Sequence, residues 1–170
     1  MKNKKGLVMG VANQKSIAWG IAEVLSIEGA SLALTYQGDN FKKRVEPLAK
    51  SIGSNLVFDV DVTDETSVDK CFNELSKKWG SLDFVVHALA FSDKSELSGR
   101  FINTSRKNFL NSLDISCFSL IDVSKKCSVL MKTGGAILTL SYLGSQRVTP
   151  NYNVMGVAKA ALESSVRYLA

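Results

Sequence analysis

The sequence has no apolar run of the roughly 18 residues that a membrane-spanning helix requires. Its N-terminus, with Lys2, Lys4 and Lys5 before an apolar stretch, superficially resembles a secretory signal. That stretch, residues 6–12, has the minimum length, contains two glycines and continues into a polar segment, residues 13–15. These features favour a strand followed by a loop. They exclude a membrane span and predict a cytoplasmic protein.

Cysteine and histidine are also scarce, with three and one residues respectively. Cys71, Cys117 and Cys127 are widely spaced and form no C-x-x-C pair, which argues against a disulfide framework and a zinc site. We expect them to be buried free thiols. His87 ends an apolar run and cannot form a multi-histidine metal site alone. The sequence therefore predicts no metal centre, and His87 is expected in the core rather than on a ligand.

No dense basic cluster is present, although 21 basic and 16 acidic residues leave a net charge of +5. The basic residues are scattered over separate amphipathic segments without interleaved aromatics, which favours solvated faces over nucleic-acid binding. A mild preference for an acidic partner remains open. With 170 residues, two prolines and no linker, the chain is expected to form one domain, residues 1–170, without a separate substrate domain.

Short apolar runs alternate with longer segments of helical period, which is the pattern of a parallel sheet covered by helices. The expected strands are residues 6–9, 31–35, 56–60, 84–87 and 136–141. This β-α order, repeated five times, predicts an α/β fold with a Rossmann-type doubly wound parallel sheet. Such a fold ordinarily has a sixth strand, so we expect the C-terminal strands to be absent from this chain.

Apolar stripes predict which helix faces lie on the sheet. One stripe follows a capping Ser16, a second follows Asp64, and a third lies in residues 39–51, where Pro47 predicts a kink or a break. The three stripes are, in order, Ile17, Ile21, Val24 and Leu25; Val68, Cys71, Phe72, Leu75 and Trp79; and Phe41, Val45, Leu48 and Ala49.

The segment 105–131 differs because apolar residues leave it few wholly polar faces. One side can pack on the sheet, and the other requires a partner. A second copy of the chain is the simplest partner. We therefore expect this helix and the final one, residues 152–170, to build a subunit interface.

Three loops at the carboxyl ends of the expected strands can meet a dinucleotide. Gly10 lets the backbone approach a pyrophosphate at a helix N-terminus, although Ala12 replaces the second glycine of G-x-G-x-x-G, and a tight turn closed by Ser16 would fit equally. Gln37, neither acidic nor basic, favours NAD over NADP. Asp61 and Val62 can border the adenine, while a capping or loop role for Asp61 is equally compatible.

Tyr152 and Lys159 lie seven residues apart, nearly two helical turns, so both are expected on one face with Met155 between them. A nearby ammonium is expected to lower the pKa of the phenol and ease proton donation. A chance pairing on one face is the alternative. Tyr142, at the end of the fifth expected strand, can face the same cavity or can be a core or rim aromatic.

Two motifs together resemble a known family. Gly10 with Ser16-x-Ala18 matches the divergent glycine motif G-x(5)-S-x-A, and Tyr152-x-x-Met155-x-x-x-Lys159 matches the divergent active-site motif of short-chain dehydrogenases. In combination they resemble bacterial NADH-dependent enoyl-[acyl-carrier-protein] reductases along the whole chain. The resemblance implies that NADH reduces a trans-2-enoyl thioester, carried by acyl carrier protein, in fatty-acid synthesis by a cytoplasmic homotetramer.

The resemblance also implies residue roles. Tyr152 would hold the enolate oxygen, Tyr142 would be the second active-site tyrosine, and Lys159 would bind the nicotinamide ribose. The implied cofactor contacts are Gly10, Ser16 and Ile17 at the pyrophosphate, Gln37 at the adenosine, Asp61 and Val62 at the adenine, and Leu89; Ser92 is the implied substrate contact. Relatives often carry glycine and alanine where this chain has Ala90 and Ser92.

The resemblance further implies a missing C-terminal third, so the isolated 170-residue chain is expected to bind cofactor weakly and to reduce little or nothing. Two alternatives remain. One is a 3-oxoacyl or other carbonyl reductase, in which Thr139 polarises the carbonyl. The other is a non-catalytic nucleotide-binding protein, which would not need the Tyr152 and Lys159 pair.

Overall fold

The computed structural model describes residues 1–170, and its elements follow the predicted order. The strands are β1 (Lys5–Met9), β2 (Ser31–Tyr36), β3 (Leu56–Asp59), β4 (Phe84–His87) and β5 (Ala136–Thr139). The α-helices are α1 (Ile17–Ile27), α2 (Asp39–Ser51), α3 (Glu65–Trp79), α4 (Arg106–Leu113), α5 (Ser119–Ser128) and α6 (Asn153–Leu169). Short helical turns are η1 (Lys94–Glu96), η2 (Phe101–Asn103), η3 (Asp114–Phe118) and η4 (Leu143–Ser145).

The chain divides into two compact units. The first comprises Met1–Ala88 and Lys125–Thr139, and the second comprises Leu89–Ser124 and Leu140–Ala170. A single domain over residues 1–170 stays a prediction.

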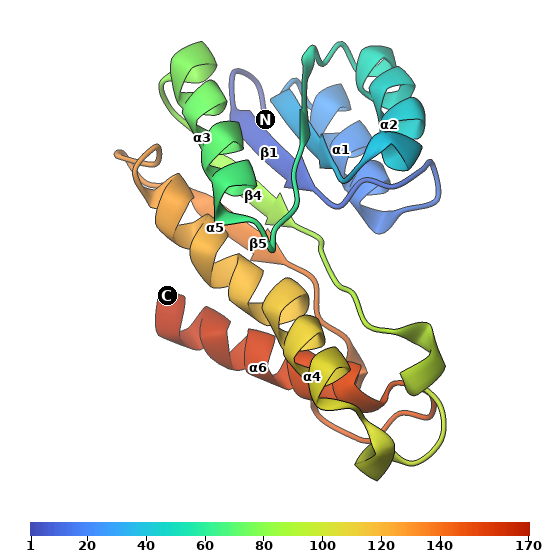
Figure 1. Ribbon diagram of the computed structural model, residues 1–170. Helices are drawn as coiled ribbons and strands as arrows, with labels where there is room; N and C mark the ends of the chain where they lie inside the picture. The colour runs from blue at the N-terminus through green and yellow to red at the C-terminus, as the bar shows by residue number, and fades with distance from the viewer. The chain divides into compact units, whose positions relative to one another are not determined.

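The first unit contains a five-stranded sheet in the order β3-β2-β1-β4-β5, in which every neighbouring pair is parallel. The strand order reverses between β1 and β4, which is the switch point of a doubly wound sheet. Right-handed crossovers then place α1 and α2 on one face and α3 on the other, as Figure 1 shows. The predicted Rossmann-type fold is confirmed.

The side of α1 that faces the sheet carries small residues and one aromatic residue, whereas a stripe of larger aliphatic residues was expected there. Ala18, Trp19 and Ala22 enter the core with the inner residues of β1, β2 and α2. Ile17 is 69 % exposed and Val24 is 58 % exposed, so their predicted place in the core is wrong. Burying the large Trp19 ring selects a face that runs through Ala18 and Ala22.

In α2, Val45, Leu48 and Ala49 are buried as predicted, whereas Phe41 is exposed. A kink or a break was predicted at Pro47; the helix continues through Pro47, which rules out the break. Pro47 lies on the exposed side, where water can hydrate the Lys43 carbonyl that loses its helical partner.

The predicted stripe of α3 is confirmed, with Trp79 partly exposed. Asp64 caps the helix by accepting a hydrogen bond from the Thr66 N–H, 2.9 Å away. All three cysteines are free and buried, as predicted. No helix combines the length and the apolar character needed to cross a membrane.

The second unit contains the helix predicted at residues 105–131 as far as Ser124. α4, η3 and α5 follow one another without a break and end at Ser128, whereas the helix was expected to continue to Met131. η3 is a π-helical turn, which the periodicity did not predict. α6 lies alongside α4 and η3 (Figure 1), and Cys117, Leu120 and Leu162 form a small core between the helices.

Candidate functional site

The loop between β1 and α1 is shaped by Gly10 and Ser16. Gly10 has a φ of 95°, a conformation that favours glycine. The Ser16 hydroxyl oxygen accepts hydrogen bonds from the backbone N–H groups of Ala12 (3.3 Å) and Asn13 (3.4 Å). Ser16 is the N-cap residue of α1, as predicted, but its side chain makes no capping hydrogen bond to the helix. Its hydroxyl folds back onto the loop and holds the turn instead.

This arrangement fits a pyrophosphate. The first N–H groups of α1 receive no side-chain cap, and the positive end of the helix dipole lies at the same place. The Ile17 side chain, at the first helical position, is exposed rather than packed in the core. The start of α1 therefore combines uncapped backbone N–H groups with an exposed apolar side chain.

Gln37 and Asp61 meet beyond the ends of β2 and β3. Burial raises the pKa of Asp61, but hydrogen bonds from the Thr63 hydroxyl and N–H and from the Gln37 side chain outweigh it, so the pKa lies below its ordinary value. The two Thr63 donors lie 2.7 and 2.9 Å from Asp61 Oδ1. Asp61 thus shapes its own loop, and the neighbouring Val62 is half-buried.

In the second unit, Tyr142 and Tyr152 come together. Their ring centroids lie 4.7 Å apart with the planes tilted by 57°. Tyr152 is the N-cap residue of α6, so it stands just before the helix that carries Lys159. The residues just before η4 and just before α6 therefore bring two phenols to one place.

Two features hold the Tyr142 loop on α6. Glu163 accepts hydrogen bonds from the hydroxyl groups of Ser141 and Ser145, one on each side of Tyr142. These bonds lower the pKa of Glu163, and burial opposes them weakly. Gly156 lets the loop approach closely, because a Cβ atom there would lie 2.7 Å from the Gly144 carbonyl oxygen.

The expected lowering of the Tyr152 pKa is wrong. Burial, and secondarily Tyr142, raise the pKa of Tyr152 above its ordinary value. Lys159 is buried, and its ammonium donates a hydrogen bond to the Leu140 carbonyl oxygen, 2.7 Å away. Burial lowers the pKa of Lys159. Its charge is therefore directed to a backbone carbonyl rather than to the phenol.

The segment after β4 carries the two remaining predicted residues. Leu89 and Ser92 are both half-buried. The Ser92 hydroxyl lies 3.2 Å from both polar side-chain atoms of Asn108. Sequence reasoning missed Asn108 and also Glu163. The four-residue spacing of Asn108, Ser112 and Ser116 within a mainly apolar segment was the available signal for Asn108, whereas nothing local marked Glu163.

The predicted site residues fall into two sets. Within the first unit, Gln37 and Asp61 meet; within the second, Tyr142 and Tyr152 meet. The first unit holds Gly10, Ser16, Ile17, Gln37, Asp61 and Val62, and the second holds Leu89, Ser92, Tyr142, Tyr152 and Lys159.

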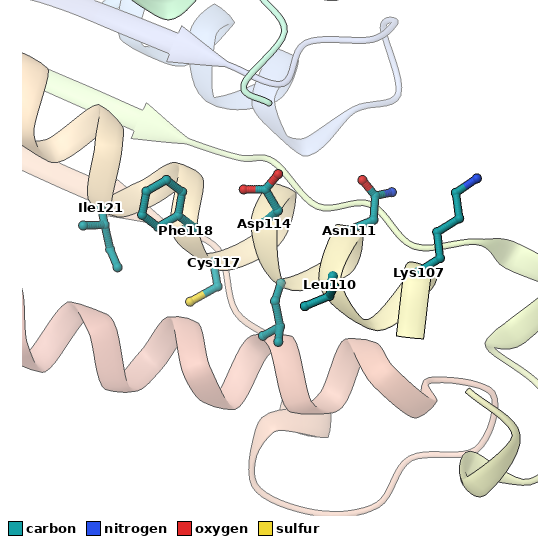
Figure 2. A pocket seen from close by; sticks show the side chains of 8 residues that line it. Lys107, Leu110, Asn111, Asp114, Cys117, Phe118 and Ile121 are labelled. Atoms are coloured by element: carbon teal, nitrogen blue, oxygen red, sulfur yellow. The ribbon is translucent and has the colours of Figure 1, made fainter. Parts of the chain in front are cut away.

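A separate groove follows α4, η3 and α5. Figure 2 shows its lining residues, of which Leu110 and Phe118 are 57 % and 55 % exposed. The lining is Lys107, Leu110, Asn111, Leu113, Asp114, Cys117, Phe118 and Ile121. The groove is thus mainly apolar, with polar residues Lys107, Asn111 and Asp114 among its lining.

Comparison with known proteins gives a consistent result. A family model described as "Enoyl-(Acyl carrier protein) reductase" matches residues 10–170. The chain is 57 % identical over 170 residues to the enoyl-[acyl-carrier-protein] reductase [NADH] 1 of Rhizobium meliloti, and 52 % identical to the enoyl-[acyl-carrier-protein] reductase [NADH] FabI of Rickettsia typhi. Both matches take in 100 % of this chain, but only 62 % and 65 % of those relatives.

Solved structures agree. The enoyl-(acyl-carrier-protein) reductase from Anaplasma phagocytophilum in complex with NAD matches with a TM-score of 0.98 and 58 % identity, over 100 % of this chain and 65 % of that one. FabI from Candidatus Liberibacter asiaticus matches with a TM-score of 0.98 and 52 % identity, over 99 % and 66 %. The chain spans slightly less than two thirds of the length of these proteins and belongs to the enoyl-(acyl carrier protein) reductase family.

Proposed function

We propose that the intact protein is a cytoplasmic enoyl-[acyl-carrier-protein] reductase of fatty-acid synthesis, which uses NADH to reduce the double bond of a trans-2-enoyl thioester. The pairing of the Tyr142 and Tyr152 rings, 4.7 Å apart, is the observation that carries the proposal. Two adjacent phenols can hold a developing oxyanion. The names of the relatives and their NADH dependence support the same reaction.

The cofactor is proposed to be NAD. Gly10, Ser16 and Ile17 would hold its pyrophosphate, since the turn offers backbone donors at a helix N-terminus. Gln37 would lie at the adenosine, and Asp61 with Val62 at the adenine. When bound, NADH would supply the hydride for the β-carbon of the thioester, and the α-carbon would receive its proton from a phenol or from water. The neutral Gln37 supports a free ribose hydroxyl, because a 2′-phosphate would be served by a cation there.

The phenols act on the oxygen of the thioester. The Tyr152 hydroxyl, whose pKa burial raises above its ordinary value, would donate a hydrogen bond to the enolate oxygen. Tyr142 supplies the second phenol. Lys159 would give up its bond to the Leu140 carbonyl to hold the nicotinamide ribose. Leu89 would lie beside the cofactor and Ser92 near the acyl chain.

The carbonyl-reductase alternative receives less support. It needs the Thr139 hydroxyl to donate a proton to a substrate ketone. That hydroxyl donates to the His87 carbonyl oxygen, 3.1 Å away, and its oxygen lies 3.1 Å from His87 Nδ1. A group engaged in this way would have to break an internal hydrogen bond to serve a substrate.

The test is a comparison of crotonyl and acetoacetyl thioesters with NADH, using the intact protein. We expect oxidation of NADH with the crotonyl thioester and at least about tenfold less with the acetoacetyl thioester. Lys159→Ala should weaken NADH binding and activity together. Preference for the acetoacetyl thioester would favour the carbonyl reductase, and unchanged binding and turnover in Lys159→Ala would favour a non-catalytic role.

We also propose that the intact protein assembles as a homotetramer and receives its substrate on acyl carrier protein. The groove of α4, η3 and α5 supports self-association, because monomers rarely leave contiguous apolar surface exposed. Helix α6 also exposes apolar residues, including Val157 and Val166.

A further inference from the structure

Three polar side chains form a buried row on α4 and η3. Asn108, Ser112 and Ser116 are spaced four residues apart, and each is at most 5 % exposed. In an α-helix four residues slightly exceed one turn, so such a row drifts around the axis. The π turn holds more residues per turn, so four of its residues fall short of one. The two departures act in opposite directions, and all three side chains are buried.

Most hydrogen-bond partners of this row lie in one segment, residues 91–96. Asn108 Oδ1 accepts a hydrogen bond from the Asp93 N–H (2.9 Å), and Asn108 Nδ2 donates to Glu96 Oε2 (3.3 Å). The Ser116 hydroxyl oxygen accepts from the Phe91 N–H (3.0 Å). Buried polar groups require such partners, so the row and the segment stabilise each other.

Ser92 lies at the centre of the contacts. Its hydroxyl oxygen lies 3.2 Å from Asn108 Oδ1, 3.2 Å from Asn108 Nδ2 and 2.9 Å from the Ser112 hydroxyl. These contacts engage the donor and both acceptor sites of the hydroxyl. Ser92 therefore fastens the segment to α4, and the substrate would meet the surface that this fastening holds in place.

The row also reaches the tyrosine helix. The Ser116 hydroxyl lies 3.8 Å from the sulfur of Met155, a buried residue between Tyr152 and Lys159 along the chain. The segment after β4 and the start of α6 are thus held by the same helical row.

We propose that Asn108, supported by Ser112 and Ser116, is a positioning residue that fixes the Phe91–Asp93 segment for binding of the enoyl thioester. This inference rests on the proposed function. Asn108 touches no reacting atom; it acts through the backbone of Asp93 and the hydroxyl of Ser92.

The experiment measures thioester kinetics and amide hydrogen exchange in the intact protein. Asn108→Ala should raise the KM for crotonyl thioester on the order of tenfold, with kcat changed less than about threefold. The double variant Asn108→Ala with Ser92→Ala should raise KM by much less than the product of the two single increases, because both substitutions disrupt the same hydrogen-bond network. Exchange at the Phe91 and Asp93 amides should accelerate.

Asn73→Ala, on the exposed side of α3, is the matched control and should change neither KM nor exchange. If Asn108→Ala does not fold, Ser112→Ala removes a single hydroxyl and should produce the same changes to a smaller degree. An unchanged KM, or an effect on kcat and stability alone, would overturn the inference. Unchanged amide exchange at Phe91 and Asp93 would overturn the inference whether or not the protein reduces enoyl thioesters. If the protein reduces no enoyl thioester, that result alone defeats only the proposed function.

Discussion

Gly156 and Gly144 allow the contact on which the tyrosine pair depends. A Cβ atom on Gly144 would lie 2.5 Å from the Tyr152 ring, and one on Gly156 would lie 2.7 Å from the Gly144 carbonyl oxygen. Both distances are shorter than van der Waals contact permits. Any side chain at either position must displace the loop or the Tyr152 ring. The absence of a side chain at Gly144 and Gly156 therefore makes room for the Tyr152 ring and for the loop that carries Tyr142.

Gly156→Ala should destabilise the protein by about 1–3 kcal/mol through overpacking and should reduce thioester turnover by moving Tyr142 relative to Tyr152. Gly20→Ala is the matched control, because Gly20 is also helical but has open space around it. It should stabilise the protein by about 0.5–1 kcal/mol, since alanine favours a helix interior. Urea denaturation and NADH oxidation measure both. Equal effects of the two substitutions would contradict this explanation.

Helix α2 tolerates an internal proline because the side that carries it is exposed. The helix runs from Asp39 to Ser51, and Pro47 removes one backbone donor within it. Val45, Leu48 and Ala49 hold the helix on the sheet through its buried face. Tertiary packing thus maintains a helix that its own sequence weakens.

Pro47→Ala should restore the missing N–H and stabilise the protein by about 1–2 kcal/mol, the cost of the proline in the helix less its effect on the unfolded chain. Denaturation midpoints in urea provide the measurement. Arg44→Ala, another exposed position of α2, should change stability by less than about 0.5 kcal/mol. A loss of stability in Pro47→Ala would show that the proline ring makes a favourable contact.

For the assembled protein, the groove of α4, η3 and α5 is the surface that a second copy would cover. Phe118→Lys places a charge in it and should shift the intact protein from a tetramer to smaller species at micromolar concentration, as measured by light scattering. Ile27→Lys is the control, because Ile27 is 78 % exposed on α1, outside the groove. A tetramer that survives Phe118→Lys unchanged, or a monomeric unsubstituted protein, would refute this assembly.

Much of the fold follows from local patterns. Short apolar runs predicted all five strands within two residues, because parallel strands that helices can cover on both faces carry apolar side chains throughout. The inner strands β1, β2 and β4 are largely buried, whereas the outer strands β3 and β5 are partly or largely exposed. Helix faces were less predictable. Ile17 and Val24 belong to an apolar stripe of α1, yet they are exposed and Trp19 enters the core instead. Two neighbouring faces of this helix are apolar, and the volume of the sheet residues opposite decides which face is buried.

The amino-acid order alone was sufficient to establish the succession of strands and helices and the two motifs of the family, because these depend on neighbouring residues. The folded chain was needed for the Ser16 turn, the raised pKa of Tyr152 and the anchoring of Ser92 by Asn108. Burial and hydrogen bonds between residues far apart in the chain, such as Ser141 and Glu163, arise only when packing brings them together.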